Sequence, residues 1–157
     1  MRWSMTLKSA FIVGLTLACV APAAAQPQAH LLRLTPLLSV EEIEPVIPFW
    51  SALGWESLNP MEVDGRLAFL AFRKDGQEIH YQTLAHIETK IPGSTSMLSG
   101  STALLYLTID NLDLVIAALG GDIEVVIPRR RTPWGADEIY VKEPGGHLIG
   151  FAQFGRN

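Results

Sequence analysis

The chain has 157 residues, of which 48% are apolar and 18% are charged. This composition indicates one globular domain and excludes both an intrinsically disordered chain and a membrane protein with several spans. The formal charge is −4, and about −6 once the two basic residues of the first 25 positions are set aside. An acidic body argues against a nucleic-acid partner, which needs basic surface to neutralise its phosphates.

Residues 1–25 have the pattern of a secretory signal peptide. Two basic residues precede an apolar stretch at 11–20, which is shorter than the roughly 20 residues of a membrane span. Small residues at 23–25 suit a cut before Gln26. We therefore expect a periplasmic or secreted protein with no membrane partner after cleavage. The only cysteine, Cys19, lies in this segment and leaves a lipoprotein as the alternative.

A strand and a helix are expected to follow a polar leader at 26–31. Residues 32–38 have the composition of a strand. Ser39 and Glu42 have the spacing of a capping box, which predicts that a helix begins there. Apolar residues then recur at i, i+3, i+4 and i+7, as on one face of a helix: Val46, Phe49, Trp50 and Leu53. Gly54 is expected to end this helix.

Three strands and a polar linker complete the first half of the body. The strands are expected at 55–58, 66–72 and 77–83, and a Lys-Asp-Gly turn at 74–76 joins the last two as a hairpin. Residues 85–100 are polar and contain three serines, two glycines and one proline, which favours an irregular linker.

The same pattern then returns. A strand at 102–109 leads to a helix capped by Asp110, whose apolar stripe is offset by 66 residues from the first one: Leu112, Val115, Ile116 and Leu119. Three further strands are expected at 123–127, 137–141 and 147–154. The sequence therefore predicts an internal duplication of a βαβββ unit.

The predicted fold class is α+β, with two tandem βαβββ units that form curved mixed sheets around a concave cavity. The units span 32–84 and 101–154 within a domain at 32–154, and the linker spans 85–100. Each unit alone leaves one sheet face uncovered, so two units must pair. Pairing within one chain and exchange between two chains both stay open, and we expect a homodimer.

These patterns resemble the vicinal oxygen chelate superfamily, which includes glyoxalase I, extradiol dioxygenases and bleomycin-resistance proteins. The stretch from Thr132 to Phe151, TPWGADEIYVKEPGGHLIGF, is similar to the closing hairpin of that family. The stretch from Thr35 to Trp55 is similar to its first strand and helix. The resemblance covers about residues 32–154. It implies the duplicated fold, whereas function does not follow from the fold alone.

The resemblance also implies where a divalent metal would bind. Catalytic members use His, Gln and Glu from the first and last strand of each unit, and these positions fall on Thr35, His80, Leu104 and Gly150. Leucine and glycine offer no donor and a threonine hydroxyl is a weak one, whereas a catalytic site needs about three protein ligands. We therefore expect no metal cofactor. His80 is the weak candidate ligand. In the alternative in which a metal binds, Glu78, Gln82 and Glu138 are the candidates for its further ligands.

The metal-free bleomycin-resistance branch, which this chain resembles most, encloses its ligand with aromatic walls and a few polar groups. Residues expected to face such a cavity are Thr35, Glu78, His80, Gln82, Tyr106, Trp134, Glu138 and Tyr140. Strand alternation places Tyr106 on that face and Ile149 and Phe151 on the opposite one. The basic run at 129–131 fits either a solvated strand edge or an anionic ligand, whereas the acidic body suits a cationic one.

The sequence shows no nucleophile motif and no phosphate-binding glycine loop, so no catalytic residue is predicted. The leading hypothesis is an exported, metal-free protein that binds and sequesters a small molecule. The first alternative is a metal-dependent lyase, isomerase or dioxygenase with a non-standard ligand set. The second is a non-catalytic scaffold whose cavity is filled by side chains such as Leu37, Leu104 and Leu148.

Overall fold

The structure of the protein, a computed structural model, describes residues 31–155. The predicted signal peptide and Cys19 lie outside these residues. The elements in chain order are β1 (Leu37–Val40), a 3-10 turn (Glu44–Val46), α1 (Ile47–Ala52), β2 (Glu56–Val63), β3 (Arg66–Lys74), β4 (Gln77–Thr83), α2 (Leu84–Lys90), α3 (Ser94–Leu98), β5 (Leu104–Thr108), α4 (Leu112–Leu119), β6 (Glu124–Arg131), β7 (Ala136–Lys142) and β8 (Leu148–Phe154). Among the described residues no helix is long and apolar enough to cross a membrane.

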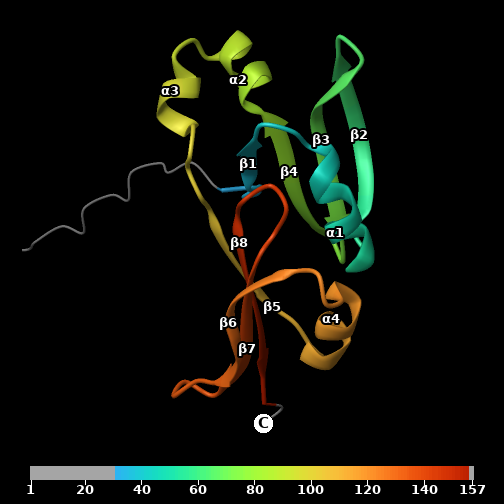
Figure 1. Ribbon diagram of the computed structural model, residues 1–157, viewed down its shortest axis with the longest axis vertical. Helices are drawn as coiled ribbons and strands as arrows, with labels where there is room; N and C mark the ends of the chain where they lie inside the picture. The colour runs from blue at the N-terminus through green and yellow to red at the C-terminus, as the bar shows by residue number, and fades with distance from the viewer. Residues whose placement is uncertain (1–30, 156–157) are drawn as a thin grey trace, which may run out of the picture. The chain divides into compact units, whose positions relative to one another are not determined.

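The strands form two four-stranded sheets with the same topology (Figure 1). The first sheet has the order β1-β4-β3-β2, and the second has the order β5-β8-β7-β6. In each sheet the first strand is parallel to the last one, and the other neighbours are antiparallel. The predicted α+β fold with a duplicated βαβββ unit is therefore confirmed.

One face of each sheet packs against the helix of its own unit. In the first sheet, Trp50 of α1 is fully buried and contacts the rings of Phe72 and Tyr81. Its indole N–H donates to the Tyr81 hydroxyl over 2.9 Å, so the buried donor has an acceptor. In the second sheet the buried side chains include Ile149 and Phe151, as strand alternation predicted. The opposite face of each sheet carries no helix of its own unit, and we call it the open face.

Two tight hairpins set the register of the first sheet. Asp75 and Gly76 join β3 to β4, and both have positive φ, 49° and 76°. The Asp-Gly pair tolerates this left-handed geometry, which matches the twist of the flanking strands. Asp64 and Gly65 form an equivalent turn between β2 and β3, with φ of 51° and 75°. The first of these turns was predicted from the sequence, whereas the second was not.

The two predicted helix caps are wrong. Ser39 lies in β1 and pairs with Gln82, so it does not begin a helix, and α1 is preceded by a 3-10 turn with no side-chain cap. In the second unit, Asn111 rather than Asp110 is the cap, and its side-chain oxygen accepts from the backbone N–H of Leu114 over 3.1 Å. A residue at N-cap must be followed at once by helical backbone, and the chain begins α4 one residue later than predicted.

The linker at 85–100 is not irregular as predicted, because α2 and α3 occupy most of it. Glu88 of α2 explains how so polar a segment is ordered. Its carboxylate accepts from the backbone N–H groups of Thr95 and Gly93, over 2.8 and 2.7 Å, and from the Ser94 hydroxyl over 3.2 Å. These bonds, led by the one from Thr95, lower the pKa of Glu88 to about 2. The small polar residues that suggested a loop therefore connect two helices.

The two units meet at His147, which is buried at the start of β8. Its Nδ1 accepts from the backbone N–H of Ala103 over 3.1 Å, so the ring proton lies on Nε2, 3.2 Å from the Ser39 carbonyl oxygen. His147 thus satisfies one backbone group from each unit. Nearby, a Cβ on Gly145 would lie 2.8 Å from a methyl of Val40, which shows how closely the β7–β8 turn approaches β1.

Candidate functional site

A cluster of polar and aromatic side chains lies on the open face of the second sheet. Tyr106 of β5 pairs with Gly150 of β8, and Gly150 pairs with Tyr140 of β7. Glu138 lies two residues before Tyr140 on β7 and therefore on the same face. The Tyr106 and Tyr140 rings are 6.2 Å apart, with a tilt of 38° between their planes. Alternation in three adjacent strands thus brings together three of the residues that the sequence analysis proposed.

Glu138 is the polar centre of this cluster. Its side chain has no exposed surface, and one carboxylate oxygen accepts from Nε and Nη2 of Arg130 over 3.0 and 2.8 Å. The other oxygen accepts from the Tyr106 hydroxyl over 3.0 Å and from the Tyr140 hydroxyl over 3.5 Å. A buried carboxylate needs such partners because desolvation of an unpaired charge is costly. Both oxygens are therefore engaged by neighbouring side chains.

The two tyrosines keep their protons over the whole ordinary pH range. Desolvation, followed by the charge of Glu138, raises the pKa of Tyr140 above its usual value. Desolvation also raises the pKa of Tyr106, although the neighbouring Trp134 opposes the rise. Each hydroxyl that donates to Glu138 keeps its own oxygen as an acceptor. The cluster thus offers acceptor oxygens and ring faces to a ligand.

Gly150 is the floor beneath the two rings. A Cβ at this position would lie 2.7 Å from Cε1 of Tyr140 and 3.1 Å from Cδ2 of Tyr106. A side chain and the two rings therefore cannot occupy this space together. The family resemblance assigned a metal-binding glutamate to this position, and here tyrosine rings fill the volume that such a side chain would take.

Trp134 and the Tyr106 ring border this face on its solvent side. Trp134 lies between β6 and β7 with 59% of its surface exposed. Tyr106 is 43% exposed, and Leu104, one step along the same face of β5, is 56% exposed. Exposed aromatic and aliphatic groups thus lie beside a buried polar centre on this face.

Arg130 is a member of the cluster that the sequence analysis missed. In the sequence, Arg130 is part of a basic run that fits a solvated edge or an anionic ligand. The structure pairs Arg130 with Glu138 and pairs Arg129 with Asp113 and Asp137, over 2.7 Å for the last contact. The cross-strand register, Arg130 opposite Glu138, is the signal that would have found it.

A second group of predicted residues lies on the open face of the first sheet. Nε2 of His80 is 3.2 Å from Oε2 of Glu78, and the His80 ring packs edge-on against Phe69. Glu78 also accepts from Arg73, over 2.5 and 2.9 Å, and from Arg33 over 3.0 Å. The bond from Arg73, followed by that from His80, lowers the pKa of Glu78. Glu78 is thus an anion held mainly by guanidinium groups.

The two remaining predicted residues lie apart from these groups. Thr35 precedes β1 and is half-buried outside any strand, because the strand begins at Leu37 rather than at residue 32. Gln82 is buried on β4, and its amide nitrogen has no hydrogen-bond partner among the described residues. The structure therefore brings Tyr106, Trp134, Glu138 and Tyr140 into one cluster, places Glu78 beside His80 in another, and adds neither Thr35 nor Gln82 to them.

The donor set does not fit the divalent metal that the resemblance implied. No group of three or more His, Cys, Asp or Glu residues suited to a metal occurs within residues 31–155. His80 lies beside Glu78, but two arginines already occupy that carboxylate. Leu104 offers no donor, and the space above Gly150 is taken by tyrosine rings. Metal sites with catalytic function need about three converging ligands, which these residues do not provide.

Comparisons with known proteins support the fold. No protein-family model matches the sequence, and no curated protein matches it. Among solved structures, a glyoxalase/bleomycin resistance protein/dioxygenase from Nocardioides superposes with a TM-score of 0.61 at 18% identity, over 82% of this chain and 86% of that chain. TnmS3, an antibiotic-binding protein from Streptomyces sp. CB03234, gives 0.54 at 21% identity, over 80% and 100%. A hypothetical protein from S. aureus gives 0.62 at 16% identity, over 80% and 96%. These likenesses confirm the glyoxalase-like fold that the sequence resemblance implied.

Proposed function

We propose that this chain is an exported member of the vicinal oxygen chelate superfamily that binds a small molecule on the open face of its second sheet. The ligand is sequestered rather than transformed, and no metal takes part. The observation that carries the proposal is the cluster of Tyr106, Tyr140 and Glu138 above Gly150, which gives an exposed aromatic wall with a neutralised carboxylate beneath it. The fold is shared with an antibiotic-binding protein, which supports the same class of function.

The chemistry of the cluster favours a flat ligand that carries a positive charge or N–H donors. Because Arg130 and Tyr106 already satisfy Glu138, a ligand meets the tyrosine oxygens, which accept, and the ring faces, which attract cations. An anionic ligand has less to gain, since Arg129 and Arg130 are both paired with acidic side chains. The acidic body of the chain adds a long-range attraction for cations.

Two features oppose the alternatives. A metal-dependent enzyme would need donors that Leu104 and Gly150 do not supply, and the carboxylate beside His80 is held by two arginines. A filled scaffold would bury its open faces, yet Leu37, Leu104 and Tyr106 are 50%, 56% and 43% exposed in the single chain. Exposed apolar groups of this kind mark an interaction site, so we expect a second copy of the chain or a ligand to cover them. We therefore expect a homodimer.

The proposal is tested with bleomycin and ethidium, two cations with flat aromatic parts. Binding is followed by tryptophan fluorescence, and the recovered probe is analysed by chromatography. We expect saturable binding with the probe unchanged. Tyr106→Ala and Tyr140→Ala should each weaken it about tenfold, as for an aromatic residue at the centre of a binding surface. Tyr106→Phe keeps the ring and should weaken it less.

The control is Val63→Ala, which removes an exposed apolar side chain from the first sheet and should change nothing. Binding of neither probe, or equal binding by the wild type and both alanine variants, would contradict the proposal. Conversion of a probe to product would replace it with the enzyme alternative.

A further inference from the structure

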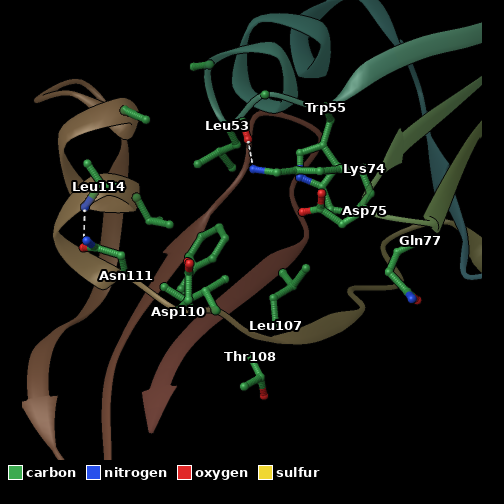
Figure 2. A pocket seen from close by; sticks show the side chains of 16 residues that line it. Leu53, Trp55, Lys74, Asp75, Gln77, Leu107, Thr108, Asp110, Asn111 and Leu114 are labelled. Carbon is green, nitrogen blue, oxygen red and sulfur yellow. Dashed lines mark hydrogen bonds between the residues drawn. The ribbon is translucent and has the colours of Figure 1, made fainter. Parts of the chain in front are cut away.

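A cavity lies away from the open faces, where the helices of the two units approach each other (Figure 2). Its volume is about 590 Å³, within the range of pockets for drug-sized molecules. Its inner wall is apolar and comes from both units, with Leu53 and Trp55 after α1 and Phe151 on β8, all three buried. A molecule in this cavity would therefore touch both halves of the duplicated fold.

Two carboxylates stand on opposite walls of the cavity. Asp75 comes from the β3–β4 turn, and Asp110 comes from the segment between β5 and α4 (Figure 2). Asp110 is available because Asn111 caps α4 in its place. Neither carboxylate forms an ion pair with any residue that the structure describes.

The one basic side chain of the cavity lining is held by a backbone carbonyl of the same wall. Nζ of Lys74 donates to the carbonyl oxygen of Leu53 over 2.6 Å, at the end of α1. This contact holds the ammonium group against the wall, where the helix C-terminus favours a positive charge. The lining therefore carries two carboxylates and one tethered cation, a net charge of −1 beside the apolar inner wall.

We infer that this junction cavity is a second binding site, distinct from the open-face cluster, for an organic amine with an apolar body. The apolar part packs on Leu53, Trp55 and Phe151, and the ammonium group lies between Asp75 and Asp110. A ligand that contacts both units also favours the folded arrangement of the two, and bound ligand should raise the melting temperature.

The probe for this site is monodansylcadaverine, whose ammonium group and naphthalene ring match the two parts of the cavity. Its emission rises in an apolar environment, which gives the binding curve directly. Dansylamide has the same ring without the ammonium group. We expect monodansylcadaverine to bind more tightly than dansylamide, and to raise the melting temperature of the protein.

Asp75→Asn and Asp110→Asn remove each charge while keeping the shape. Each should weaken monodansylcadaverine about two- to fivefold, as expected for charges near solvent, and should leave dansylamide unchanged. Asp64→Asn is the matched control, because Asp64 has the same turn geometry in the other hairpin and lies outside the cavity. Ala118→Trp places a large ring at the exposed helix face that lines the cavity, and it should abolish binding of both probes.

Two results would overturn the inference. If Tyr106→Ala, which alters the open face, abolishes monodansylcadaverine binding while the aspartate variants do not, the probe occupies the open-face site. If the probes bind only at protein concentrations at which sedimentation shows a monomer, formation of the dimer must cover the cavity. The cavity is then an interface between two copies of the chain. Either result leaves the separate test of the open-face site with bleomycin and ethidium unaffected.

Discussion

Replacement of Gly150 by alanine tests whether the two tyrosine rings hold the position that the structure assigns to them. The new Cβ would lie 2.7 Å from Cε1 of Tyr140, against a normal carbon–carbon contact of about 3.5 Å, so that ring must shift by nearly 1 Å. Such a shift moves the Tyr140 ring out of its position beside Glu138. Overpacking of this kind costs about 1–3 kcal/mol. The gain from replacing a strand glycine is about 0.5–1 kcal/mol.

The expected net result is a loss of about 1–2 kcal/mol in the free energy of unfolding. Urea unfolding followed by tryptophan fluorescence measures it. The decisive comparison is the same change in a Tyr140→Ala background. With that ring absent, Gly150→Ala should be neutral or stabilise by about 0.5 kcal/mol, which gives a coupling of about 1–2.5 kcal/mol between the two positions. An equal loss in both backgrounds would refute the reasoning.

Three further predictions concern groups outside the cluster. His147→Phe leaves two backbone groups without partners where the units meet, and should lower the free energy of unfolding by about 2–4 kcal/mol in urea; a loss below 1 kcal/mol would show that water replaces the imidazole. Tyr81→Phe removes the acceptor of the buried Trp50 N–H and should cost about 1–3 kcal/mol in the same assay, whereas no change would indicate another acceptor. Glu88→Gln should lower the melting temperature at pH 7. Because folding lowers the pKa of Glu88 from 4.5 to about 2, its contribution is complete above the unfolded value and is lost as the pH falls towards 2. A gap between variant and wild type that stays constant from pH 7 to pH 2.5 by circular dichroism would contradict this.

Local periodicity predicted most of the fold. The strand at 77–83 has the same bounds in the structure, because a hairpin turn fixes its start and alternation fixes its faces. The apolar stripe predicted for the first helix is also confirmed. Phe49 and Trp50 of this stripe are both buried, as is expected when one face of a helix packs on a sheet. The duplication follows from two copies of one pattern, and the shared strand order of the two sheets bears it out.

The predictions that were wrong concern residue patterns that are compatible with more than one local structure. Serine and glycine at 93–101 suit a loop. In the structure, however, the Glu88 carboxylate accepts from the backbone N–H groups of Gly93 and Thr95, and these bonds connect two helices. Ser39 has the spacing of a cap, yet pairing with β4 holds it in a strand. In the candidate site, alternation correctly placed Tyr106 on the open face. The Arg130–Glu138 pair depends on register between two strands, which no single segment of sequence contains.

The central claim is that the tyrosine wall of the second sheet holds the ligand. The chain has three tyrosines, so a protein labelled with 13C in the tyrosine rings gives one set of ring signals for each. Tyr106 and Tyr140 belong to the proposed site, whereas Tyr81 is buried against α1. On titration with whichever of bleomycin or ethidium binds, the signals of Tyr106 and Tyr140 should shift together in proportion to the bound fraction while those of Tyr81 stay in place. Saturable binding that leaves the Tyr106 and Tyr140 signals unmoved would contradict the account.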